Sequence, residues 1–249
     1  MLNSIDLSES GLGTTERTAL VDYCQALWDA PSCDVQSIIL YGSALREDYR
    51  PGRSDINLLV VQETIDVSIL NSVVDTVSGG QRYGFAPFFL TAVDLRSSAD
   101  VFPVKFLMMQ DSYQVLLGED VLGSLRISQG NLRLRCEQQT KNLLLRLRRH
   151  YVMGGGRRRT EMLSRTIGGF LETLRVIVSL GEGTLPPRAE VLDAAAGAFD
   201  LDAELLRNVV ALRDLDGSLT SEDADRLYDG FMATVERVAH FTDQQDCKQ

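Results

Sequence analysis

The chain has 249 residues, of which 44% are hydrophobic and 24% are charged, as in an ordinary globular protein of one large or two ordinary domains. Its net charge of −10 argues against extended nucleic-acid binding, because the neutralisation of phosphates supplies most of that affinity. No apolar stretch approaches the roughly 18 residues that span a bilayer, and the N-terminus has no signal character. The four cysteines are widely spaced and form no metal-ligand pattern. We therefore expect a cytoplasmic protein.

The first half of the chain predicts an alternation of helices and strands. Apolar residues recur at helical spacing in two segments, and short apolar runs between turn residues indicate buried strands. Thr14 or Thr15 is the expected N-cap of the first helix. In chain order, the expected elements are a helix over 15–28, strands over 38–41 and 55–61, a helix over 65–77, and strands over 85–93 and 113–117.

From Arg126 onward the pattern is typical of helices alone. The expected helices cover 127–152, 157–180, 188–199, 203–212 and 221–241. We therefore predict two domains, an α+β domain over 1–125 and an all-α helical bundle over 126–249. Residues 126–165 carry 11 of the 25 Lys and Arg residues against only two acids, Glu137 and Glu161. An anionic group could bind there, although long arginine side chains can also cover a bundle surface and pair with acids.

The most informative stretch is SIILYGSALREDYRPGRSDINLLVVQ, residues 37–62. Gly42-Ser43 follows one predicted strand, and Asp55 and Asn57 lie one residue apart at the start of the next. Because side chains alternate along a strand, Asp55 and Asn57 share one face. Gly42 permits close approach of a ligand to the backbone, and Ser43 lies where a helix N-terminus could present free N–H groups to a phosphate.

This arrangement resembles the signature of the nucleotidyltransferase superfamily with the DNA polymerase beta-like fold, in particular its bacterial antibiotic nucleotidyltransferase branch. The resemblance implies a mixed sheet with flanking helices, followed by a helical domain. It also implies that Gly42 and Ser43 hold the triphosphate of a nucleoside triphosphate such as ATP, and that positions 55 and 57 hold Mg²⁺. The acceptor would be a hydroxyl on an unknown small molecule or protein.

Three further residues are candidates for the same site. Asp94 follows the predicted strand over 85–93 and is the nearest candidate for the third carboxylate that the family uses as general base; the alternative is a polar residue that merely ends a strand. Lys105 could reach a phosphate or be a solvated side chain. Lys141 on the basic helix is the best single candidate in the second half for binding the nucleotide.

Position 57 departs from the family pattern, which has a second Asp there. Asn57 keeps one oxygen ligand but loses the charge and the ability to bridge two cations. A loss of about 4 kcal/mol in the transition state would slow the reaction roughly a thousandfold. Two hypotheses therefore stay open: a nucleotidyltransferase whose activity is attenuated or lost, and a non-catalytic nucleotide-binding or protein-interaction module, a pseudoenzyme, on the same fold.

Overall fold

The computed structural model describes residues 5, 7–8, 10–31, 33–154, 156–214 and 219–244. The chain divides into two compact units, Met1–Ile127 and Ser128–Gln249, a division two residues beyond the one expected from the sequence. No helix in the described ranges is both long enough and apolar enough to cross a membrane.

The first unit is built on a mixed sheet of four strands in the order β3-β2-β1-β4. β1 pairs antiparallel with both β2 and β4, whereas β2 and β3 run parallel. The strands are β1 Val35–Tyr41, β2 Ile56–Gln62, β3 Phe85–Thr91 and β4 Tyr113–Gly118. The apolar runs of the sequence become these strands because both of their faces are covered.

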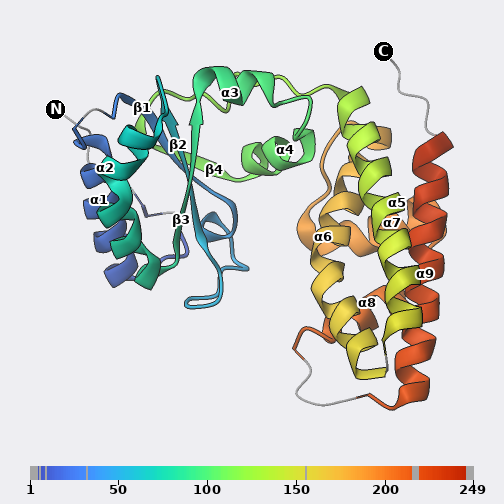
Figure 1. Ribbon diagram of the computed structural model, residues 1–249. Coiled ribbons are helices and arrows are strands. Elements are labelled where there is room, and N and C mark those ends of the chain that lie inside the picture. The colour runs from blue at the N-terminus through green and yellow to red at the C-terminus, as the bar shows by residue number, and fades with distance from the viewer. Residues whose placement is uncertain are drawn as a thin grey trace. The chain divides into compact units, whose positions relative to one another are not determined.

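Helices cover both faces of this sheet (Figure 1). α1 (Thr14–Trp28) and α2 (Val67–Gly80) pack on one face, whose core includes the alternate β2 side chains of Ile56, Leu58 and Val60. α3 (Ala92–Ser97) and α4 (Pro103–Asp111) cover the other face, with Leu59 and Val61 in its core. Two short 3-10 helices, η1 (Gly42–Leu45) and η2 (Gln81–Tyr83), complete the unit. The expected period of two along β2 and the α+β fold class are confirmed.

Helix ends in this unit differ from the prediction in two places. The N-cap of α1 is Gly13, whose N–H donates to the Glu16 carboxylate at 2.8 Å, so neither Thr14 nor Thr15 caps it. The expected extension of the third strand to residue 93 is wrong, because α3 already begins at Ala92.

The second unit consists of helices alone among its described residues. α5, α6 and α9 are the long helices, and α7 and α8 are short (Figure 1). Their bounds are α5 Gln129–Met153, α6 Gly156–Glu182, η3 Arg188–Glu190, α7 Val191–Phe199, α8 Ala203–Ala211 and α9 Ser221–Gln244. The carboxylate of Asp202 accepts the N–H of Leu205 and caps the start of α8. The fully buried Tyr228 ties α9 to α5 by donating to the carbonyl of Leu147 at 2.8 Å.

Candidate functional site

One row of four side chains crosses the sheet near the end of β1. The pairing register aligns Tyr113 of β4 with Tyr41, Tyr41 with Asn57, and Asn57 with Ala86 of β3. Directly opposed residues project from the same face of a sheet, so these four lie on the face that α3 and α4 cover. Burial raises the pKa of Tyr41 above its ordinary value, which keeps its hydroxyl neutral. The row therefore forms an uncharged floor.

Gly42 turns the chain sharply where β1 ends. Its φ of +85° is in the left-handed region, which favours glycine over residues with a side chain. The Gly42 N–H donates to the carbonyl of Ser112 at 2.8 Å, which fixes the corner to the start of β4. A Cβ at position 42 would lie 3.6 Å from Nδ2 of Asn57. The corner and Asn57 are therefore immediate neighbours.

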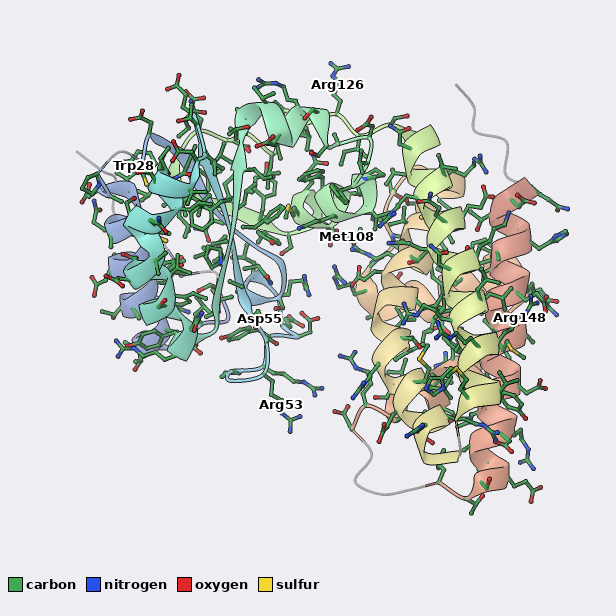
Figure 2. All side chains as sticks on the ribbon, viewed as in Figure 1. Trp28, Arg53, Asp55, Met108, Arg126 and Arg148 are labelled. Carbon is green, nitrogen blue, oxygen red and sulfur yellow. The ribbon has the colours of Figure 1, made fainter. Side chains whose placement is uncertain are left out.

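Ser43 and Asp55 flank this corner. Ser43 is the second residue of η1, beside the Tyr41 and Asn57 pair, and Asp55 directly precedes β2 (Figure 2). Asp55 is exposed, and its carboxylate has neither an ion pair nor a hydrogen bond in the described part of the chain. The Ser43 hydroxyl likewise makes no hydrogen bond to any described residue. Both groups are available to a ligand, and the structure brings them to the same end of the sheet.

Asn57 is partly buried between these groups. Its Nδ2 donates weakly to the backbone carbonyl of Asp55 at 3.4 Å. This assignment leaves Oδ1 as the side-chain atom that can accept a hydrogen bond or coordinate a cation. The position offers a neutral oxygen where a carboxylate would offer a charged one.

Asp94 is not brought together with these residues. Thr91, three residues before it, pairs with Gln62 at the far end of β2, five residues or about 16 Å along the strand from the Asn57 and Ala86 pair. The Asp94 carboxylate instead accepts the N–H and the hydroxyl of Thr91 at 3.0 and 2.7 Å, in the capping box of α3. The Thr91 hydroxyl is the main cause that lowers the pKa of Asp94. Its place in the structure is that of a helix cap.

The residue of β3 that faces Asn57 is Ala86. It occupies the register position from which a carboxylate could approach both Asn57 and the Gly42 corner. Sequence reasoning missed it because alanine carries no chemical signal and the register of a parallel pair cannot be deduced from one sequence. β2, β3 and η1 contain no acid, and Asp55 is the carboxylate that directly precedes β2 at this end of the sheet.

Lys105 lies on α4, over the same face of the sheet. Its Nζ stands 3.4 Å from the ring centroid of Phe88, a cation–π contact. Phe88 is two residues beyond Ala86 on that face. Partial burial of the ammonium lowers the pKa of Lys105 below its ordinary value. Lys105 is thus a positive charge on the site's face of the sheet, without a carboxylate partner among the described residues.

Lys141 has carboxylate partners. Its Nζ lies 2.7 Å from Oε1 of Glu137 and 3.0 Å from Oδ1 of Asp243. These bonds, first that to Glu137, raise the pKa of Lys141. The helical unit therefore already neutralises the lysine that the sequence favoured for binding the nucleotide.

A polar cavity of about 520 Å³ opens beside η1. It is lined by Leu45 of η1, by Asp111 at the end of α4, by Ser112, and by Tyr113 and Gln114 at the start of β4. The Ser112 hydroxyl donates to the carbonyl of Gly42 at 3.4 Å, so the cavity adjoins the Gly42 corner. Its volume falls in the range of small-molecule sites.

The comparisons with known proteins support the fold. No protein-family model and no curated protein matches the sequence. Among solved structures, spectinomycin adenyltransferase AAD(9) from Enterococcus faecialis, determined with ATP and spectinomycin, matches with a TM-score of 0.56 at 11% identity. The match covers 90% of this chain and 100% of that one. The chain has a nucleotidyltransferase fold.

The donor set of this nucleotidyltransferase fold fits one Mg²⁺ ion at most. The Asp55 carboxylate and the Asn57 amide oxygen can supply two oxygen ligands, and phosphate oxygens of a nucleotide can complete the shell. A pair of ions needs a second bridging carboxylate. Within the described ranges, no group of three or more His, Cys, Asp or Glu side chains is placed to hold a metal. The arrangement suits binding of a phosphate chain better than two-metal chemistry.

Proposed function

We propose that this chain binds a nucleoside triphosphate at the Gly42 corner and that its nucleotidyl transfer is attenuated or lost. The observation that carries the proposal is the juxtaposition of Gly42, at a φ of +85°, with Asn57 across the strand pair, next to the unpartnered Asp55 and Ser43. The corner retains the parts that hold phosphates. The positions that would carry the second and third acids hold Asn57 and Ala86.

Each residue of the corner has a role in binding. The bare backbone at Gly42 lets the phosphate chain approach, and the Ser43 hydroxyl donates a hydrogen bond to a phosphate oxygen. Asp55 and the Asn57 oxygen would hold a single Mg²⁺, which supplies neutralisation of phosphate charge when it is bound. Lys105 on α4 provides a further cation for the same ligand.

Loss of two acids weakens transfer more than binding. Phosphoryl-type transfer depends on electrostatic stabilisation of charge that develops in the transition state, whereas a ground-state triphosphate needs only hydrogen bonds and net positive charge. Without a carboxylate at 57 or 86, Asp55 would have to serve both as the metal ligand and as the general base for the acceptor hydroxyl at this end of β2 and β3. A slow transferase remains the second candidate, supported by Asp55 and by the similarity to an adenyltransferase solved with ATP.

Calorimetry of the full chain with a panel of nucleoside triphosphates, with and without Mg²⁺, tests the proposal. Nucleotide binding without release of pyrophosphate over hours supports the binding protein. Binding with steady pyrophosphate release, abolished in Asp55→Asn, would instead establish the transferase. Absence of binding for every nucleotide would refute both and leave a scaffold.

A further inference from the structure

The helical unit contains a basic groove of its own between α5 and α6. A cavity of about 310 Å³ is lined by the arginines Arg135, Arg146 and Arg165, together with the polar side chains of Gln139, Asn142 and Thr173. A second cavity of about 350 Å³ shares Arg146 with the first and adds Arg149, His150 and Arg158. Among the described residues, no carboxylate belongs to either lining. We call these two cavities together the arginine groove.

The groove arginines differ from most others in this unit. Seven arginines elsewhere in the helical unit pair with acids: Arg133–Glu137, Arg148–Glu236, Arg159–Asp225, Arg188–Glu172, Arg207–Asp193, Arg226–Glu222 and Arg237–Asp200. Arg146, Arg149, Arg158 and Arg165 have no carboxylate partner among the described residues. Glu161, the acid nearest to them in sequence, lines neither cavity. Acid pairing therefore accounts for those seven arginines and not for these four.

The packing of the two helices concentrates this charge at one end of the groove. The Thr173 hydroxyl donates to Oε1 of Gln139 at 3.2 Å, which fixes the level at which α5 and α6 meet. Arg146 lies seven residues beyond Gln139 and Arg165 eight residues before Thr173. Because α5 and α6 run antiparallel through a short connection, both arginines lie about 10–12 Å from that level in the same direction. Arg149 and Arg158 continue the charge toward the connection.

The rest of the lining can hold a small molecule. The side chains of Gln139, Asn142 and Thr173 offer hydrogen bonds, and Leu143 and Phe170 give an apolar floor. A Cβ on Gly169 would meet no atom within 4 Å, so the groove is open to solvent there. Nδ1 of His150 is buried without a hydrogen-bond partner in the described chain. The volumes match those of small-molecule sites rather than of an extended polymer.

We propose that the arginine groove binds a small molecule that carries at least two phosphate charges. Several unneutralised guanidinium groups repel one another, and a multiply charged anion removes that repulsion. Guanidinium groups also match phosphate oxygens in bidentate geometry, so phosphate is favoured over a single carboxylate. The site lies wholly within the helical unit and does not depend on the function proposed for the Gly42 corner.

Calorimetric titration of the full chain with inorganic pyrophosphate tests this site. The double variant Arg146→Gln/Arg165→Gln is expected to weaken pyrophosphate binding at least tenfold. The matched control Arg148→Gln/Arg226→Gln removes the same charge from exposed, acid-paired arginines and should change affinity less than twofold. Equal losses in both double variants, or no binding of pyrophosphate to the unmodified chain, would overturn the proposal.

A variant of the first unit distinguishes pyrophosphate binding at the arginine groove from binding at the Gly42 corner. In Gly42→Ala, pyrophosphate binding that depends on Arg146 and Arg165 is expected to persist even though ATP binding at the corner is weakened. Pyrophosphate binding that disappears in Gly42→Ala would place the ligand at the corner and refute the groove. Affinity for single-stranded RNA that rises with oligomer length and exceeds that for pyrophosphate would also overturn the proposal of a small molecule.

Discussion

Replacement of Gly42 by alanine tests the corner with a single methyl group. At a φ of +85° an L-residue is strained by roughly 1–2 kcal/mol. The reduced freedom of the unfolded chain offsets about 0.4–1 kcal/mol of that strain. The new Cβ would meet Nδ2 of Asn57 at 3.6 Å, an ordinary contact, so no clash adds to the strain. We expect Gly42→Ala to lower the free energy of unfolding by about 1 kcal/mol, or about 2–4 °C in melting temperature.

The effect on nucleotide affinity should be larger than the effect on stability. The methyl group would project toward Asn57, where the phosphate chain must approach the backbone. Loss of one hydrogen bond to a charged phosphate removes about 1.5–3 kcal/mol, because such bonds are stronger than neutral ones. Since about 1.4 kcal/mol corresponds to a factor of ten, ATP affinity should fall roughly 10–150-fold.

Gly52→Ala is the matched control. Gly52 has a φ of +72°, and a Cβ there would meet no atom within 4 Å. The control carries a similar backbone strain in the same unit but adds no methyl group at the corner, so ATP affinity should change less than twofold. Calorimetry gives both affinities and thermal unfolding gives both stabilities. Equal ATP affinity in the two folded variants would show that the nucleotide does not bind at Gly42.

Three other substitutions give distinct outcomes. Without Mg²⁺, Asn57→Asp should lower the free energy of unfolding by about 1 kcal/mol. Because a carboxylate replaces a neutral ligand, the affinity for Mg²⁺ measured by calorimetry should rise at least tenfold, and an unchanged affinity would mean that the pocket is not a metal site. Asp94→Ala should lower the melting temperature yet leave ATP affinity within twofold. Thr91 holds the pKa of Asp94 below its ordinary 3.8, so the stability difference between the two proteins is present above that pH and shrinks as pH falls through the lowered pKa. A stability difference that persists in acid would contradict the role of Asp94 as a cap. Gly118→Ala places a Cβ 2.0 Å from the carbonyl oxygen of Gln36 at a φ of +82°. Urea unfolding, followed by the fluorescence of the single tryptophan, should show that the free energy of unfolding falls by about 3 kcal/mol or more, and a near-native midpoint would refute the packing there.

Much of the first unit could be predicted because its signals are local. The apolar runs on either side of Gly42-Ser43 predict β2 to within one residue at each end, and they predict the end of β1, which begins three residues before the predicted start, at Val35. The start of α3 could also be predicted, because Thr91 and Asp94 have the spacing of a capping box. The alternation of apolar residues that continues past Thr91 concealed this signal. That local signal decides the position of Asp94, which belongs to a helix and not to the extended face of β3.

The remaining features depend on pairings between distant parts of the chain. Ala86 matters only because the parallel register of β2 and β3 sets it opposite Asn57. Lys141 is neutralised by Asp243, which is 102 residues away. The basic segment was visible from composition, but which arginines pair and which line a groove follows from the level at which α5 and α6 meet. The periodicity of apolar residues along one helix does not determine which of its residues lie opposite those of the neighbouring helix.

Asn57 links the stability of the first unit to its proposed function. A carboxylate at this partly buried position would lose hydration and would lie two residues from Asp55, whose charge it would repel; both effects disfavour the ionised form. Two acids there would need cations to offset that repulsion, whereas asparagine removes the repulsion and keeps one side-chain oxygen. The same exchange removes the group that bridges two metal ions. An end of the sheet that is stable without metal therefore fits the proposed binding of a nucleotide better than its transfer.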